Sequence, residues 1–252
     1  MLLLVPALIG TVATVALAAA AVYVRALTVA AGAVAAIFGG AIVVFAGFPF
    51  LALMVLFLVS SVLATRYRFA EKEARHLQEG TTGERGISNV LAHILIPTAI
   101  AVAGGLPTPG LGVPGLDVLY TSALAFGASD TFASEFGVLA GRARSILTLR
   151  PVPPGTNGGV SALGEAFAFA GAAVTGVVGV GLFGAFGGFP ERSAIFLVAV
   201  VVAGFLACQL DSVLGELLEN RGLLTKHSTN FLGMLGAVVI AAGIYAAAGV
   251  LL

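Results

Sequence analysis

Charged residues are scarce in this chain of 252 residues: lysine, arginine, aspartate and glutamate together make up 10% of it. Soluble domains carry roughly 25% charged residues. Hydrophobic residues account for 59% of the chain. A protein surrounded only by water does not bury so many apolar side chains, so the composition excludes an ordinary soluble domain and indicates a surface that partly faces lipid.

Further absences narrow the possible functions. The formal net charge is zero, so no electrostatic attraction to nucleic acid is implied. A single cysteine, Cys208, excludes an intramolecular disulfide. No Gly-x4-Gly-Lys-Ser/Thr phosphate loop occurs, which excludes a soluble P-loop kinase. The first apolar run lacks the basic n-region of a signal peptide and is too long for an h-region, so we expect it to span the membrane.

Long apolar runs recur along the whole chain, and each is close to the roughly 20 residues that a helix needs to cross a bilayer. The sequence therefore predicts an all-α fold: one integral membrane domain over residues 1–252, a polytopic bundle of about eight transmembrane helices. The expected spans are about 2–24, 27–46, 49–65, 87–104, 117–139, 160–184, 193–218 and 230–251.

The basic residues give an orientation for these spans. Of the twelve, all but Arg192 lie in the connections between spans one and two, three and four, five and six, and seven and eight. The positive-inside rule places such connections in the cytoplasm, so both termini are expected outside. The connection 66–86 mixes both signs of charge, and we expect a short surface helix there that ends near Gly80 and serves as a solvated connector. Binding of lipid headgroups or substrate by this segment is the alternative.

A short pattern recurs within the expected spans. Asp, a hydroxyl residue, two apolar residues, a small residue and Glu occur at 130–135 and again at 211–216, with a faint copy lacking the acids at 60–65. A hydroxyl residue followed by Asn comes after each copy, ending at Asn89, Asn157 and Asn230. We expect a leading pair of spans, about 2–46, and a parallel repeat of hairpins at about 49–104, 117–184 and 193–251. Many secondary transporters use inverted repeats instead.

The acids of this pattern are the main candidates for chemistry. An ionised side chain costs at least ~2.5–3.5 kcal/mol at the centre of a bilayer, so such residues are functional candidates by default. No lysine or arginine lies within these spans, so a divalent cation is the expected partner, and Mg²⁺ suits carboxylates together with substrate phosphates. The candidate metal and catalytic residues are Asp130, Glu135, Asp211 and Glu216.

Depth and helix geometry restrict how these acids act. Asp130 precedes Arg142 by twelve residues and Asp211 precedes Arg221 by ten, which puts both aspartates roughly 15–18 Å from those basic residues, in the cytoplasmic half. An Asp and a Glu five residues apart differ by about 140° around a helix. Either the helix is irregular there or each carboxylate faces a different neighbour. Protonated acids hydrogen-bonded across helices are the alternative to a metal site.

The connection 148–161 is rich in proline and glycine. Its glycines permit positive φ angles, and backbone N–H groups that lead into a helix N-terminus form an anion site. An ordinary Pro/Gly turn is the alternative. Glu165, His93 and His227 lie near these elements, with the two histidines expected to be structural. The candidate residues for binding substrate or nucleotide are Asn89, Arg150, Thr156, Asn157, Gly158, Gly159, Lys226 and Asn230.

Together, the segment around Asp130 to Gly137 and the run from Val152 to Ser161 resemble the membrane-protein family that contains the chloroplast phytyl-phosphate kinase. The resemblance extends from about Arg25 to the C-terminus. It implies conversion of an isoprenyl monophosphate to its diphosphate by a nucleoside triphosphate. Related phytol and dolichol kinases and the more distant CDP-lipid synthases use CTP, so CTP is the implied donor.

The alternatives differ in chemistry. A CTP-dependent prenol kinase or a cytidylyltransferase that forms a CDP-lipid would use the same kinds of residue. An ion-coupled transporter would use the buried acids as a relay. It would need polar residues in the outer half of the membrane, where spans five and seven carry few besides Thr121, Ser122 and Ser193. The sequence therefore favours an enzyme that acts on a lipid phosphate from the cytoplasmic side.

Overall fold

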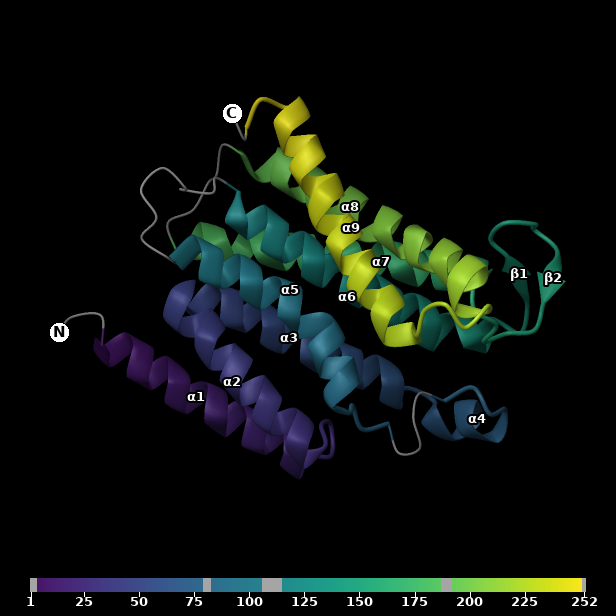
Figure 1. Cartoon of the computed structure of the whole chain (residues 1–252), viewed down its shortest axis with the longest axis horizontal. Coiled ribbons are helices and arrows are strands. Elements are labelled where there is room, and N and C mark those ends of the chain that lie inside the picture. Colours follow the sequence, from purple (N-terminus) through teal and green to yellow (C-terminus); the bar gives the residue numbers. More distant parts are fainter. Residues whose placement is uncertain (1–3, 79–82, 106–114, 187–191, 251–252) are drawn as a thin grey trace.

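A computed structural model describes residues 4–78, 83–105, 115–186 and 192–250, which form an elongated bundle of helices (Figure 1). The long helices match the expected spans to within a few residues, so the prediction of an all-α polytopic bundle is confirmed. They are α1 (Leu4–Tyr23), α2 (Val29–Phe45), α3 (Phe48–Arg66), α5 (Ile87–Gly105), α6 (Leu116–Gly137), α7 (Ala162–Ala185), α8 (Ser193–Leu214) and α9 (Lys226–Ala247).

Length and hydropathy identify five of these helical segments as long and apolar enough to cross a membrane: α3, α5, α7, α9 and the continuous segment Ser193–Glu219. That last segment is α8 extended by the π-helical turn η3 (Gly215–Glu219). The apolar helix α2 is shorter, with 17 residues, and α6 carries more polar residues than the others. The five clear spans establish a multi-pass architecture by themselves.

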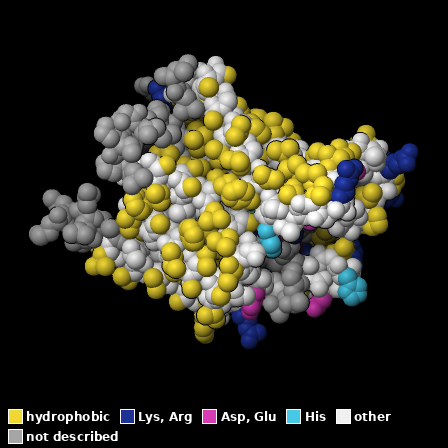
Figure 2. Space-filling view, viewed as in Figure 1, with side chains coloured by type: hydrophobic (Ala, Val, Ile, Leu, Met, Phe, Trp, Pro, Cys, Tyr) yellow, Lys and Arg dark blue, Asp and Glu magenta, His cyan; other side chains and the backbone are white. Residues whose placement is uncertain are grey.

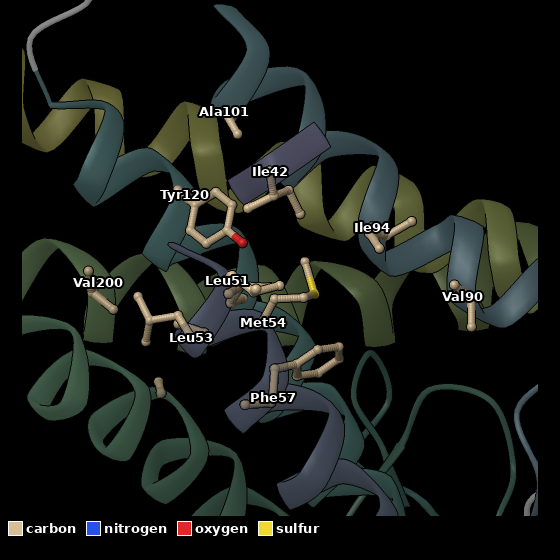
Figure 3. Packing of buried hydrophobic residues seen from close by; sticks show 14 of the residues in the cluster. Ile42, Leu51, Leu53, Met54, Phe57, Val90, Ile94, Ala101, Tyr120 and Val200 are labelled. Atoms are coloured by element: carbon tan, nitrogen blue, oxygen red, sulfur yellow. The ribbon is translucent and has the colours of Figure 1, made fainter. Parts of the chain in front are cut away.

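Helix α6 is the centre of the bundle and packs against α3, α5, α7, α8 and α9. Its stretch from Tyr120 to Ser129 is almost wholly buried, and Figure 3 shows Tyr120 among the apolar side chains of the surrounding helices. Close approach of α7 depends on Gly171, where a Cβ atom would lie 2.8 Å from the carbonyl oxygen of Ala128. Asp130, which directly follows this buried stretch, therefore lies on a tightly packed part of α6.

Side-chain caps fix the helices that begin at the end of the bundle near α4 and the strands. The hydroxyl of Ser161 accepts a hydrogen bond of 3.1 Å from the backbone N–H of Gly164 at the start of α7. Thr225 and Ser228 form a reciprocal capping box at the start of α9. Such caps stabilise a helix terminus by about 1 kcal/mol, and here they set where α7 and α9 enter the bundle.

Two connections at this end have structure of their own. Between α6 and α7, a 3-10 turn η1 (Val138–Ala140) leads to the strands β1 (Ala143–Ser145), β2 (Pro151–Val152) and β3 (Gly159–Val160), which pair antiparallel in the order β2-β1-β3. The sequence analysis considered an anion-binding connection or an ordinary Pro/Gly turn here and did not predict these strands. The span expected to begin at residue 160 begins at Ala162, because Gly159 and Val160 belong to this sheet.

The other structured connection contains the short helix α4 (Phe69–Ala74), as expected for the segment 66–86. The helix was expected to end near Gly80 but ends at Ala74, and residues 79–82 lie outside the described residues. One part of the expectation was wrong: this segment is not merely a solvated connector, because Lys72 is completely buried.

Charged side chains gather at one end of the molecule. On the face shown in Figure 2, most lysines, arginines and acids lie toward the end that holds α4 and the β strands, while hydrophobic side chains cover the body of the bundle. The start of α1 and the end of α9 lie away from that end (Figure 1). The structure thus segregates polar and apolar surfaces as a membrane protein requires.

Candidate active site

A polar cavity of about 320 Å³ lies between the ends of α6 and α8, the starts of α7 and α9, and the connection that follows β2. Residues as far apart in sequence as Leu77 and Asn230 meet there. The sequence-predicted residues that line it are Asp130, Glu135, Thr156, Asn157, Gly158, Gly159, Asp211, Lys226 and Asn230. Leu77 and Gln78, which follow α4, also line the cavity.

Asp130 and Asp211 form the acidic part of the cavity. Both line it, and their carboxylates are close enough for the two charges to interact. The Oδ1 atom of Asp211 is buried and accepts no hydrogen bond from any residue that the structure describes. A buried acceptor left without a partner costs about 1–3 kcal/mol, so this atom is suited to a cation or to a donor supplied by a ligand.

The donor set fits Mg²⁺ only together with a substrate. Among the residues described, no three His, Cys, Asp or Glu side chains lie close enough to coordinate a metal ion by themselves. Mg²⁺ is commonly bound by one or two carboxylates, with water and substrate phosphates completing its octahedron. Asp130 and Asp211 would supply those carboxylates, and the rest of the cavity leaves room for phosphates.

Glu135 has a protein partner that the sequence analysis missed. Lys72 Nζ lies 2.5 Å from Glu135 Oε2 and also donates to the carbonyl oxygens of Ala64 and Thr65. The hydroxyl of Thr65 donates to Glu135 Oε1 at 2.6 Å. The expectation of a divalent cation as the partner of the acids did not anticipate that Lys72 pairs with Glu135. Glu71 and Glu73 beside Lys72 made the segment look solvated, and nothing local in the sequence indicates that Lys72 reaches α6.

Glu216, unlike Glu135, is not among the residues that line the cavity. Its carboxylate accepts a hydrogen bond of 2.6 Å from Ser145 Oγ and a longer one of 3.4 Å from the backbone N–H of Leu147. The side chain thus ties η3 to β1 and the turn that follows. In each copy of the motif the aspartate lines the cavity, while the glutamate is hydrogen-bonded to a residue of another element. This agrees with the predicted alternative in which the two carboxylates of one helix face different neighbours. The second acid pair also includes a helix irregularity, since Glu216 lies in the π-helical turn η3.

Two acids outside the repeated motif organise the polar cavity. Glu219 Oε1 accepts a hydrogen bond of 3.0 Å from Asn157 Nδ2, and its Oε2 accepts one of 3.4 Å from Thr229 Oγ1. Glu165 accepts one of 2.8 Å from Gln209 Nε2. Glu219 joins the glycine-rich connection to the start of α9. Sequence reasoning missed it because it lies three residues beyond the repeated motif.

Two of the predicted binding residues do not line this cavity. Arg150 is exposed beyond β1, before the first residue of β2. Asn89 accepts a hydrogen bond of 3.1 Å from Arg85 Nη1 and lies beside a separate apolar cavity. It is nevertheless linked to the site, because its carbonyl oxygen lies 2.9 Å from His93 Nδ1 and His93 Nε2 lies 3.4 Å from Asn230 Nδ2.

Gly158 shows how tightly the connection packs on η3. It has φ +76°, and a Cβ atom there would clash with Glu216 and lie 2.9 Å from the carbonyl oxygen of Ser212. We expect Gly158→Ala to destabilise the protein by more than the about 1–2 kcal/mol that positive φ costs an alanine. Gly141→Ala is the matched control, because Gly141 has φ +69° and open space around it. Equal thermal unfolding of the two variants would contradict this close packing.

Comparison with known proteins identifies relatives along most of the chain. The family model described as integral membrane protein DUF92 matches residues 12–233. An uncharacterized membrane protein of Methanocaldococcus jannaschii is 32% identical over 83% of this chain and 82% of its own length. An uncharacterized membrane protein of Synechocystis is 35% identical over 79% of this chain and 74% of its own length. No solved structure matches the chain.

Proposed function

The chain belongs to the integral membrane protein family DUF92, and from the chemistry of its polar cavity we propose that it is a prenyl-phosphate kinase. In this proposal an oxygen of an isoprenyl monophosphate attacks the γ-phosphorus of a nucleoside triphosphate, with CTP as the expected donor. The bond between the γ-phosphorus and the bridging oxygen breaks. The products are an isoprenyl diphosphate and a nucleoside diphosphate.

The observation that carries the proposal is the pair Asp130 and Asp211 in a cavity that also holds Lys226 and the amides Asn157 and Asn230. Phosphoryl transfer depends on positioning and charge neutralisation more than on covalent chemistry. A Mg²⁺ ion held by the two aspartates would neutralise the phosphates. Lys226 and the N–H groups of the connection offer donors to phosphate oxygens. No general base is needed, since the attacking phosphate oxygen is already anionic.

The proposal includes eight membrane crossings, with both termini outside and this cavity facing the cytoplasm. The parallel repeat of hairpins would place Asp130 and Asp211 at equivalent depth on α6 and α8. The segregation of basic residues to the end that holds the cavity supports this orientation. Nucleotide would then enter from the cytoplasm, while the prenyl chain remains in the bilayer.

A substrate panel tests the reaction. Purified protein with Mg²⁺ is given phytyl or geranylgeranyl phosphate, or the corresponding alcohols, each with CTP, ATP, UTP or GTP. We expect diphosphate from the monophosphates, identified by mass. A monophosphate formed from an alcohol would indicate a prenol kinase. Transfer of CMP to the lipid, with release of pyrophosphate, would indicate a cytidylyltransferase. Ion-coupled flux in proteoliposomes without nucleotide, and no product in any reaction, would contradict the proposal.

The binding role of the connection is tested by two substitutions in the same segment. We expect Asn157→Ala to raise the KM for nucleotide or prenyl phosphate about tenfold, the effect of losing about 1.4 kcal/mol of binding, because Asn157 lines the cavity. Arg150→Ala is expected to leave both KM values unchanged, because Arg150 is exposed outside it. Unchanged affinities in Asn157→Ala, or a larger loss in Arg150→Ala, would contradict this assignment.

A further inference from the structure

A second cavity, of about 330 Å³, lies between α1, α2, α3 and α5 and is lined mainly by apolar side chains. Leu51, Met54 and Phe57 from α3 and Val90 and Ile94 from α5 are part of its lining, and Figure 3 shows them. Its volume is within the usual range for binding sites of small molecules. None of the predicted catalytic acids lines it.

The apolar cavity opens on the outer surface of the bundle. Several residues of its lining are also exposed there: Leu17 (44%), Val24 (51%), Val59 (49%) and Leu63 (64%). In a membrane protein such a surface meets lipid chains. A long apolar ligand can therefore enter from the bilayer and leave part of its chain outside the cavity.

Almost all of the surface of this cavity is apolar, but four polar residues, Arg85, Asn89, His93 and Ser61, are part of its lining and mark what we call its polar end. Ser61 is completely buried, and its Oγ atom has no hydrogen-bond partner among the residues described. Arg85 is 7% exposed and donates to Asn89 Oδ1 and Thr65 Oγ1. A buried guanidinium group at the end of an apolar cavity favours an anionic group on the ligand.

Backbone contacts hold Arg85 in place. Its N–H donates to the carbonyl oxygen of Ala26 at 3.0 Å, and its own carbonyl oxygen accepts a bond of 3.1 Å from the N–H of Thr28. The turn between α1 and α2 thus positions this arginine. The polar end is consequently a built feature rather than a flexible surface side chain.

A single layer of side chains separates the two cavities. Thr65 contacts Arg85 on one side and Glu135, which lines the polar cavity, on the other. His93 lines the apolar cavity, Asn230 lines the polar one, and their side chains lie 3.4 Å apart. An anionic group at the polar end would therefore lie next to the proposed site of phosphoryl transfer.

We propose that the cavity between α1, α2, α3 and α5 binds the isoprenoid chain of the substrate, with the monophosphate at its Arg85 end. The phosphate reaches the polar cavity past the contact between His93 and Asn230. This inference rests on the proposed function for the identity of the ligand. A chain with one small anionic head suits a cavity that has one polar end, whereas a two-chain phospholipid needs a wider one.

Filling the cavity tests the inference. Ala35 on α2 lines the apolar cavity, and its neighbour Ala36 lines a different groove on the same helix. We expect Ala35→Trp to weaken binding of geranylgeranyl phosphate at least about tenfold and to leave CTP binding unchanged. Ala36→Trp should bind both as the wild type does. Wild-type affinity for geranylgeranyl phosphate in a folded Ala35→Trp variant would overturn the inference.

A direct readout separates failure of the site from failure of the proposed function. Geranylgeranyl phosphate with a diazirine on its terminal isoprene unit is photolysed on the wild-type protein, and the labelled peptides are identified by mass spectrometry. Labels on α1, α2, α3 or α5 are expected, even if no nucleotide supports turnover. Labels confined to α7, α8 or α9 would overturn the inference while leaving a kinase activity intact.

Discussion

Replacing Asp211 by asparagine is expected to reduce kcat at least about a hundredfold, as loss of a charged group that neutralises phosphate does. The substitution keeps the size of the side chain and removes its charge. Because Asp211 Oδ1 already lacks a hydrogen-bond partner among the described residues, we expect the variant to fold and insert normally. Turnover of prenyl phosphate is measured at saturating nucleotide, and Asp130→Asn should behave alike.

The matched control is Asp117→Asn. Asp117 lies in the first turn of α6, outside the polar cavity, and its Oδ1 accepts a hydrogen bond from the N–H of Val118. It therefore shares a helix with Asp130 but not the proposed chemistry. Wild-type kcat in Asp211→Asn, or an equal loss in Asp117→Asn, would remove Asp211 from the proposed metal site.

Breaking the ion pair between Lys72 and Glu135 is expected to have the largest effect on stability. Both side chains are buried, and removing one partner from a buried pair costs about 3–5 kcal/mol, because it leaves the other charge uncompensated. Lys72→Met should therefore lower the free energy of unfolding by that amount. The double variant Lys72→Met/Glu135→Gln should recover much of the loss, since no charge then remains buried there.

An exposed pair between α4 and the residue that follows it provides the control. Arg75 and Glu71 are 2.6 Å apart, but their side chains are 45% and 26% exposed. Such surface pairs contribute about 0–1 kcal/mol, so Arg75→Met should change thermal unfolding little. If Lys72→Met is as stable as Arg75→Met, the buried pair does not hold α4 against α6.

Much of the fold follows from sequence because apolar runs of bilayer length leave a helix few alternatives. The recurring acidic motif in the sequence also predicted that Asp130 and Asp211 meet, since equal depth on neighbouring helices would bring them to one level. Both line the same cavity in the structure. These predictions used only the lengths of apolar runs, the recurring motif and the distribution of charge, all of which can be read along the sequence.

The rest depends on contacts between distant segments. Lys72 lies among charged residues, and only the packing of α4 shows that it reaches Glu135. The hydrogen bond between Ser145 and Glu216 spans 71 positions and joins η3 to strand β1. The strands of that sheet have two or three residues, too few for a period-two pattern in the sequence. Asn89 fits the repeated motif but lies beside the apolar cavity. The start of α5 lies on the other side of the layer of side chains that separates the two cavities.

The most direct test of the account is whether Asp130 and Asp211 hold one divalent cation. Mn²⁺, which replaces Mg²⁺ and is paramagnetic, is titrated into the purified protein with CTP and followed by electron paramagnetic resonance. We predict a bound ion in the wild type and in Asp117→Asn that is lost in Asp130→Asn and in Asp211→Asn. Undiminished Mn²⁺ binding in a variant that lacks both aspartates would contradict the account.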